Sequence, residues 1–208
     1  MIEELTLDNY GCIIETIPNN ILSLLLNESL VLEKRNSTMT SGLSGSGVTK
    51  HYYMNDENLQ IFLDYILTLK NKYLTKYPSY LSEFRFLSDN VPFACDKPWF
   101  NIQRKGEFTP NHIHDGVLSY SAWLKIPYDL AEETKDGKYA SCFEFTHSTI
   151  TASSTSKLLP IDKTWEGKIM MFPSKLMHCV YPFHTVDDVR ISLSGNILFD
   201  TYNARINS

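Results

Sequence analysis

The residue pattern of the chain from about residue 92 onward constrains its fold more than any other feature. Short runs of aromatic and β-branched residues alternate there with Gly, Pro, Asp and Thr, in the segments PWFNIQRKG, VLSYSAWLKIP, SCFEFT, GKIMMFP, HCVYPF and VRISLSGNILF. Roughly six to eight short strands at such spacing, with no helical pattern between them, are typical of an antiparallel sandwich or barrel. We therefore expect a β core of jelly-roll type.

A long amphipathic helix is expected ahead of this core. Asn55 or Asp56 can cap it, and Pro78 ends it at about Tyr77. Between these points apolar side chains recur at steps of three and four residues, which is the spacing of one helical face. The members of this stripe are Leu59, Phe62, Ile66, Leu69 and Tyr73. A short extended segment, 51–54, is expected just before the helix.

The N-terminal part of the chain predicts one further helix and, before it, only short strands. The run NNILSLLLNESLVLEK follows Pro18 and has helical spacing, while residues 1–17 suggest a short opening strand or two. A chain of this length supports one good-sized core. We expect a single domain, 1–208, that is mainly β with N-terminal helices, in which a helical support region at 1–90 packs on the β core at 91–208.

Composition excludes several classes of function. The net charge of −5 and the pI near 5.7 argue against a general nucleic-acid binder or an anionic-membrane binder, because both need a basic face. No apolar run approaches the roughly 20 residues that span a bilayer, and the acidic N-terminus lacks an apolar leader segment. The four cysteines, Cys12, Cys95, Cys142 and Cys179, form no CxxC pair. We expect a soluble, cytoplasmic protein with free thiols and no membrane partner.

The Gly/Ser/Thr-rich segment 36–50 superficially resembles a phosphate-binding loop. Gly42 and Gly47 have the separation that a P-loop requires, but Val48 stands where the phosphate-binding lysine belongs, and Lys50 comes two positions late. A lid or surface loop near an active site is the better interpretation.

His112 and His114 are the first candidate metal ligands. Two histidines at positions i and i+2 of an extended segment point the same way, so their imidazoles can grip one divalent metal ion. Taken alone, the pair is equally compatible with a polar loop. His178, in the predicted strand within FPSKLMHCVYPFHT, supplies a third ligand if the jelly roll brings the two strands together. His184, beyond Pro182, is expected to be exposed to solvent, and His51 and His147 have no spacing that recruits them.

The last predicted strand, VRISLSGNILF, carries a second candidate site. Its apolar and polar residues alternate, and the polar face holds Arg190, Ser192, Ser194 and Asn196. An edge strand with this face in water explains the pattern equally well. Alternatively the face lines a hydrophilic pocket, where Arg190 offers a bidentate fork to a carboxylate and Ser192 adds a hydroxyl.

In order and spacing, these motifs resemble the 2OG-Fe(II) oxygenases related to prolyl hydroxylases that occur in bacteria and phages. The matching stretches are His112-Ile113-His114, LSYSAWLKIP at 118–127, GKIMMFPSKLMHCVYP at 167–182 and RISLSGN at 190–196. The resemblance covers about half of the chain and implies a double-stranded β-helix core. It does not extend to the N-terminal half.

The resemblance also implies roles for particular residues. His112 and His178 match the two histidine ligands of iron(II), and Arg190, with Ser192 beside it, matches the arginine that binds the far carboxylate of 2-oxoglutarate. The strand before the first ligand also touches the cosubstrate in the wider superfamily, which points to Asn101 and Gln103.

One position departs from the wider superfamily, in which a carboxylate completes the metal site. His114 occupies that position here, and the neighbouring carboxylate is Asp115. Strand parity and the narrower family favour His114 as the third ligand, with Asp115 as the alternative.

The implied activity is a dioxygenase reaction that uses Fe(II), 2-oxoglutarate and O2 and releases succinate and CO2 while hydroxylating a small molecule or a peptide. Two alternatives remain: a jelly-roll binding module that has lost turnover, and a cupin-like metalloenzyme that does not use 2-oxoglutarate. The sequence identifies neither the substrate nor the oligomeric state, and it is compatible with a dimer.

Overall fold

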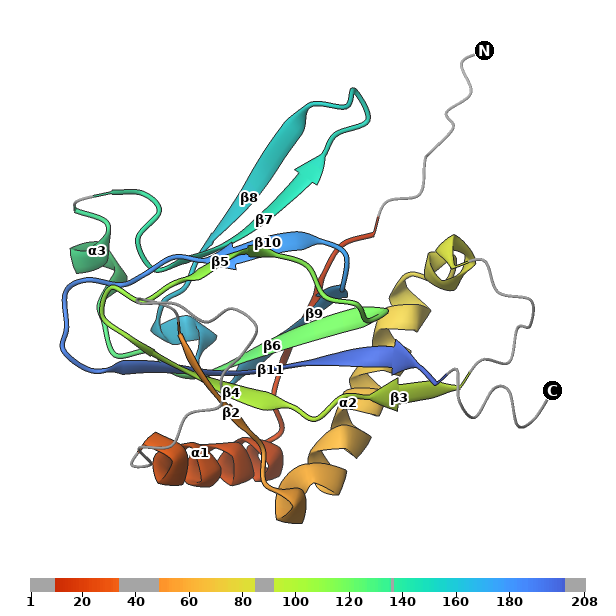
Figure 1. Cartoon of the computed structure of the whole chain (residues 1–208), viewed down its shortest axis with the longest axis horizontal. Coiled ribbons are helices and arrows are strands. Elements are labelled where there is room, and N and C mark those ends of the chain that lie inside the picture. The colour runs from red at the N-terminus through yellow and green to blue at the C-terminus, as the bar shows by residue number, and fades with distance from the viewer. Residues whose placement is uncertain (1–9, 34–48, 85–91, 136, 201–208) are drawn as a thin grey trace.

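The computed structural model describes residues 10–33, 49–84, 92–135 and 137–200. Within these ranges the strands form two facing antiparallel sheets of seven and four strands (Figure 1). The larger sheet has the order β1-β9-β6-β11-β4-β2, and β3 also pairs with β11. Its strands are β1 (Ile13–Thr16), β2 (Lys50–Tyr53), β3 (Phe93–Cys95), β4 (Trp99–Arg104), β6 (Leu118–Lys125), β9 (Lys168–Pro173) and β11 (Val189–Phe199).

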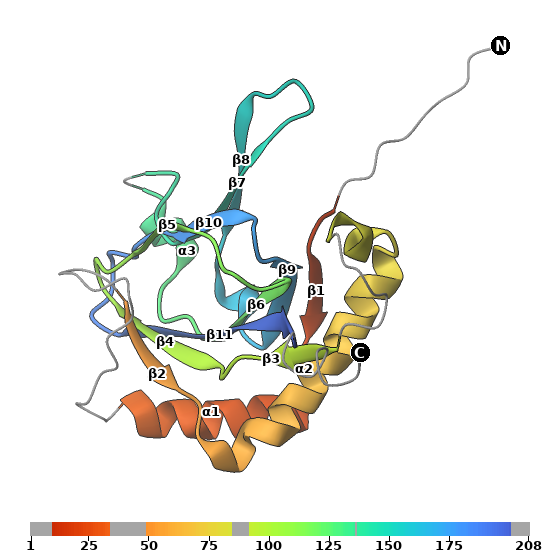
Figure 2. The same ribbon diagram turned by 45° about the vertical axis from the view of Figure 1, so that its right-hand side comes forward.

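The smaller sheet lies over one face of the larger one, and its strand order is β5-β10-β7-β8. Its members are β5 (Thr109–His112), β7 (Cys142–Ser148), β8 (Ser154–Pro160) and β10 (Met177–Val180). Strands β7 and β8 continue beyond the body as a projecting hairpin (Figures 1 and 2). The expected mainly β fold of jelly-roll type is confirmed.

The segment 146–166 is more regular than its polar sequence suggested. Strand β8 begins at Ser154 and pairs with β7 from Cys142 to Ser148. Its Ser and Thr side chains satisfy strand geometry without an apolar face, because most of the hairpin is exposed to solvent.

The two expected helices are confirmed, and they cover the outer face of the larger sheet (Figure 2). They are α1 (Asn19–Glu33) and α2 (Asp56–Lys76). Four members of the predicted stripe of α2 are at most 1% exposed, namely Phe62, Ile66, Leu69 and Tyr73. Short helical turns follow at η1 (Tyr80–Glu83), α3 (Leu130–Glu133) and η2 (Lys163–Trp165). None of the helices in the described ranges is long and apolar enough to cross a membrane.

The N-terminal part of the chain contributes strands as well as helices. Strand β1 pairs with β9 at one edge of the larger sheet, and β2 pairs with β4 at the other. Both were expected as extended segments, but the sequence did not show that they belong to the core sheet. The Gly/Ser-rich loop of residues 36–50 lies outside the described residues except for Thr49 and Lys50.

Strand β11 is central, because it lies between β4 and β6. Its apolar residues Val189, Ile191 and Leu193 are buried in the core on the helix-covered side. Its polar residues therefore face the space between the two sheets and not bulk water. The edge-strand interpretation of this alternation is thus wrong.

Candidate functional site

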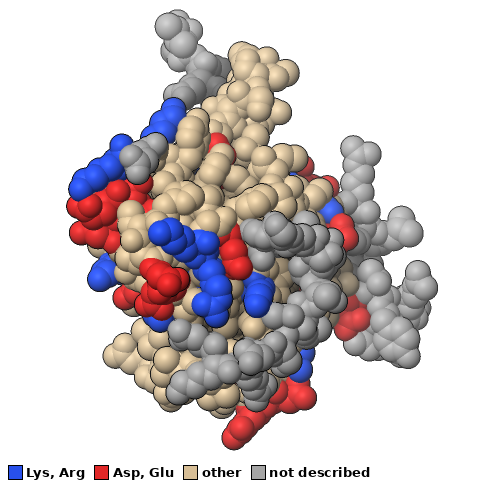
Figure 3. Space-filling view, turned by 60° about the vertical axis from the view of Figure 1, so that its left-hand side comes forward, with Lys and Arg blue, Asp and Glu red and all other residues tan. Residues whose placement is uncertain are grey.

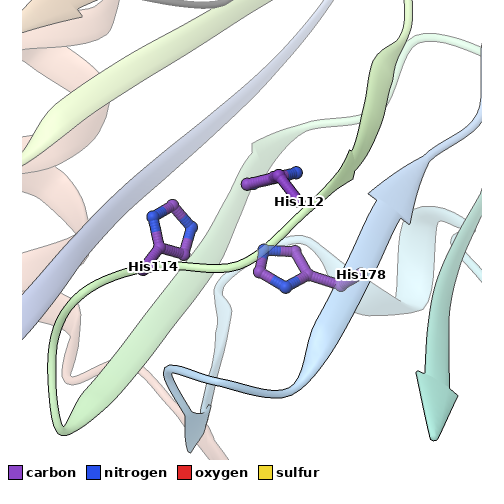
Figure 4. A group of neighbouring side chains, drawn as sticks. All are labelled: His112, His114 and His178. Carbon is purple, nitrogen blue, oxygen red and sulfur yellow. The ribbon is translucent and has the colours of Figure 1, made fainter.

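Three histidines converge between the sheets. One ring nitrogen from each of His112, His114 and His178 lies within 4.8 Å of the other two. His112 ends β5, His114 lies just beyond it, and His178 is on β10, so that the three rings face a common point (Figure 4). The ring centroids of His112 and His178 are 4.2 Å apart, and those of His114 and His178 are 5.2 Å apart. This grouping brings together the three residues that the sequence nominated.

Backbone carbonyls orient two of these rings. The Nδ1 atom of His112 lies 2.7 Å from the carbonyl oxygen of Pro110, and that of His178 lies 2.8 Å from the carbonyl oxygen of Leu176. A carbonyl oxygen can only accept, so Nδ1 carries the proton and the Nε2 lone pair is left for a metal ion. Two ligands are therefore held in the tautomer that coordination through Nε2 requires.

The surroundings keep the imidazoles neutral, which ligation also requires. Burial, followed by the proximity of His112, lowers the pKa of His178 to about 3. Burial and the same neighbour lower the pKa of His114 to about 4. His178 is seated among aromatic rings, stacked on Phe143 at a centroid distance of 5.4 Å and edge-on to Phe172 at 5.0 Å. The donor set fits a divalent transition metal such as Fe(II) with open coordination positions.

Asp115, the alternative third ligand, is directed away from this cluster. Its side chain is fully exposed, and one carboxylate oxygen lies 3.0 Å from Nζ of Lys175. The neighbouring backbone N–H of His114 donates to the carbonyl of Ser174, which fixes the chain at the point where the His114 ring turns inward. The local geometry therefore favours His114 over Asp115.

The histidines border a cavity of about 630 Å³ between the sheets. Asn101, Ser121, Ser192 and Ser194 form a polar row on the wall that the larger sheet supplies. The amide nitrogen of Asn101 donates to the hydroxyl of Ser192 at 3.2 Å and to that of Ser194 at 2.9 Å. The Oγ atoms of Ser121 and Ser194 are 3.4 Å apart. The cavity thus pairs a wall that carries three candidate metal ligands with a wall of hydrogen-bonding groups.

Arg190 is buried beside the cavity, with 2% of its surface exposed. Its Nε and Nη2 both donate to Oε1 of Gln103, at 3.1 and 2.6 Å. Nη1 donates to the phenol of Tyr128 at 2.9 Å and to the carbonyl of Ser141 at 3.1 Å, while Nη2 also donates to the carbonyl of Tyr181 at 2.8 Å. All of these acceptors are uncharged, so the guanidinium is a buried cation with no carboxylate among the described residues that bond to it.

The sequence did not identify several cavity residues. His51 lines the cavity, and its ring lies 6.5 Å from that of Trp99, which in turn lies 5.9 Å from His114. The buried Nε2 of His51 has no hydrogen-bond partner among the described residues. Tyr128, which lies outside the cavity lining and accepts a hydrogen bond from Arg190, was also missed, although it directly follows the LSYSAWLKIP segment. His184 is exposed, as expected, and so is His147.

The surface shown in Figure 3 is mixed in charge. Lys and Arg side chains lie directly beside Asp and Glu side chains on the described part of this face, and the projecting hairpin at the top is largely uncharged. This face offers no broad basic surface for a phosphate backbone.

A comparison with known protein families agrees with the choice of candidate site residues. Residues 97–196 match the sequence model of a family described as "Putative 2OG-Fe(II) oxygenase", a range that contains the three histidines and Arg190. None of the curated protein sequences matches this chain.

Solved structures show that the fold is shared as well. A prolyl-4-hydroxylase from Pseudomonas putida superposes with a TM-score of 0.57 and 12% identity, over 91% of this chain and 93% of that one. A prolyl hydroxylase from Trichoplax adhaerens, solved with a hypoxia inducible factor peptide, gives 0.56 and 14%, over 95% and 87%. The viral collagen prolyl hydroxylase of Paramecium Bursaria Chlorella virus-1, solved with 2OG, gives 0.52 and 12%, over 90% and 94%. Residues 97–196, which hold the three histidines and Arg190, thus match the 2OG-Fe(II) oxygenase family in sequence, and the solved structures show that the chain shares the fold of prolyl hydroxylases.

Proposed function

We propose that this protein is an active dioxygenase that hydroxylates a peptide or small-molecule substrate, with His112, His114 and His178 as the ligands of Fe(II). The observation that carries the proposal is the convergence of three imidazoles on one wall of the cavity between the sheets. When bound, Fe(II) with 2-oxoglutarate and O2 supplies the oxidation, in which the cosubstrate becomes succinate and CO2 and the substrate gains a hydroxyl group.

The metal-binding role rests on both the orientation and the charge of the ligands. The carbonyls of Pro110 and Leu176 hold the rings of His112 and His178, and burial lowers the pKa of all three imidazoles, which favours their neutral forms. Three neutral ligands leave one more positive charge at the metal than two histidines and a carboxylate would, which strengthens its attraction for an anionic chelating cosubstrate.

Arg190 is the proposed partner of the distal carboxylate of 2-oxoglutarate. A buried guanidinium surrounded by uncharged acceptors has lost its hydration without gaining a counter-charge, which is costly. A carboxylate delivered from the cavity would supply that charge through a bidentate contact. Ser192 and Asn101 line the same wall and are the proposed companions of Arg190 in cosubstrate binding, whereas Gln103 occupies the guanidinium edge that the carboxylate would contact.

The remaining wall of the cavity is available for substrate. Trp99 and His51 lie on the side of His114 and combine aromatic surface with an unpartnered ring nitrogen. Two of the similar proteins are a prolyl hydroxylase solved with a peptide and a viral collagen prolyl hydroxylase, so proline-containing peptides are the first substrates to test.

A binding module that has lost turnover is the alternative that the family match leaves standing. The test is anaerobic loading with Fe(II) and 2-oxoglutarate, followed by exposure to O2 in the presence of proline peptides, and then of free amino acids and sugars, with succinate quantified. The proposal expects iron-dependent succinate above the background of the metal-free protein. Tight binding of metal and cosubstrate without any succinate would support the retired module.

A further inference from the structure

Gln103 stands directly opposite Arg190 on the neighbouring strand. The two residues are cross-strand partners in the β4–β11 ladder, and both side chains are buried, with 4% and 2% of their surfaces exposed. Oε1 of Gln103 accepts from Nε and from Nη2 of Arg190 at once. This edge of the guanidinium is the fork that a carboxylate grips with two oxygens.

No donor of Arg190 is left over. An arginine side chain carries five N–H donors, and the bonds to Gln103, Tyr128, Ser141 and Tyr181 use all of them. The carbonyl of Ser141 belongs to a residue with a φ of 64°, in the left-handed region that residues other than glycine seldom adopt. The backbone at Ser141 therefore adopts an energetically unfavourable conformation next to the guanidinium. Its carbonyl holds Nη1 of Arg190, away from the edge that Gln103 occupies.

Gln103 also separates Arg190 from the cavity. The described residues that line the cavity include Gln103 but not Arg190. A ligand in the cavity can therefore reach the fork only where the Gln103 amide now lies. Two of the other acceptors of Arg190 are backbone carbonyls, and the third is the phenol of Tyr128, which is buried away from the cavity. Gln103 is therefore the acceptor at the cavity that a side-chain rotation can remove, a rotation that also breaks the bond from its amide nitrogen to the carbonyl of Glu107.

We infer that the side-chain amide of Gln103 occupies the position of the distal carboxylate of 2-oxoglutarate when the cosubstrate is absent. The cosubstrate then binds by displacing the amide oxygen of Gln103 from Nε and Nη2 of Arg190. The inference rests on the proposed role of Arg190. It makes Gln103 a positioning residue that sets the affinity for the cosubstrate: the amide satisfies the guanidinium when the site holds no 2-oxoglutarate, and yields because a neutral oxygen binds the cation less strongly than a carboxylate does.

The experiment compares 2-oxoglutarate with 2-oxopentanoate, which has the same keto acid end and a methyl group in place of the distal carboxylate. Dissociation constants are measured by calorimetry on full-length protein loaded with Ni(II), for the wild type, Gln103→Ala and Gln103→Glu. Lys105→Gln is the matched control, because Lys105 is exposed two positions away and its replacement changes the net charge by the same amount as Gln103→Glu. Circular dichroism and Ni(II) titration establish that each variant folds and holds metal.

In Gln103→Glu a permanent carboxylate occupies the fork, and the dissociation constant for 2-oxoglutarate is expected to rise about 30-fold or more, with that for 2-oxopentanoate nearly unchanged. Gln103→Ala removes the competitor, and 2-oxoglutarate is expected to bind several-fold more tightly. Unchanged binding of 2-oxoglutarate by Gln103→Glu would overturn the inference, as would weaker binding by Gln103→Ala. A wild-type protein that binds Ni(II) but does not distinguish the two keto acids would instead overturn the role of Arg190, and the inference with it.

Discussion

His112 and His178 face each other as a directly paired couple in the β5–β10 ladder, with their ring centroids 4.2 Å apart. Two of the three proposed metal ligands are thus anchored in the hydrogen-bonded sheet. His178→Ala is expected to weaken binding of Fe(II), or of Co(II) as an optical probe, by roughly 100-fold or more, because one of three ligands is lost. His147→Ala, at an exposed histidine on β7, is the control. Binding of equal strength by both variants would exclude His178 as a ligand.

The third ligand is tested by comparing two neighbouring variants. His114→Ala is expected to lose metal affinity, whereas Asp115→Ala is expected to keep it, because the Asp115 carboxylate is exposed and paired with Lys175. The intensity of the Co(II) d–d bands reports the number of ligands in each case. Loss of metal in Asp115→Ala alone would reverse the assignment.

Arg190→Lys separates the cosubstrate from the metal. A lysine keeps the positive charge but cannot offer a bidentate fork, so affinity for 2-oxoglutarate is expected to fall by at least roughly 10-fold. Affinity for Fe(II) is expected to change little, because Arg190 makes no contact with the three histidines. Calorimetry with each ligand in turn measures both quantities. An equal loss of both would contradict a cosubstrate role.

Acid is expected to destabilise the metal-free protein in a way that depends on the buried histidines. The pKa of His178 is about 3 in the folded protein, against 6.5 for an unperturbed histidine. Between these values the unfolded chain binds the additional proton, so stability is retained above pH 6.5 and falls as the pH drops toward 3. One such site changes the free energy of unfolding by up to about 1.4 kcal/mol per pH unit. Urea titrations at pH 5, 6 and 7 should therefore give a shallower pH dependence for His178→Gln than for the wild type, and equal slopes would refute this account.

Gly195 is expected to tolerate no side chain. A Cβ atom there would lie 2.2 Å from the hydroxyl oxygen and 2.5 Å from Cζ of Tyr120, its buried partner on β6. Tyr120 is held by Phe62 of α2, with ring centroids 5.9 Å apart, so the ring has little room to move. Gly195→Ala should cost about 1–3 kcal/mol of unfolding free energy. Gly137→Ala, whose Cβ would meet no atom within 4 Å, is the control, and thermal unfolding of both variants gives the comparison.

The features that could be predicted from the sequence are those with a short period. The stripe on α2 is set by steps of three and four residues, and the inward direction of both His112 and His114 follows from their separation by two. The outlines of the strands likewise follow from local patterns. Such features depend only on the backbone geometry of a few neighbouring residues.

The features that could not be predicted depend on register between distant strands. His51 reaches the cavity because β2 pairs with β4, where His51 lies opposite Asn101. The occupation of the Arg190 fork by Gln103 depends in the same way on the β4–β11 register. The alternation of apolar and polar residues along β11 fits both a solvent-exposed edge strand and a strand that lines a cavity. Only the strands that pair with β11 on both sides distinguish the two.

The edges of the larger sheet have a consequence for how the protein is made. Residue 13 pairs with residue 171, and β2 pairs with a strand whose other neighbour, β11, is the last of the described strands. On the ribosome, β1 has no partner strand until most of the chain has emerged. Helix α1 likewise cannot pack until the larger sheet, which it covers, has formed. Contacts this distant slow folding and leave apolar helix faces exposed in the meantime. The part of the chain that is synthesised first is therefore among the last to reach its final place.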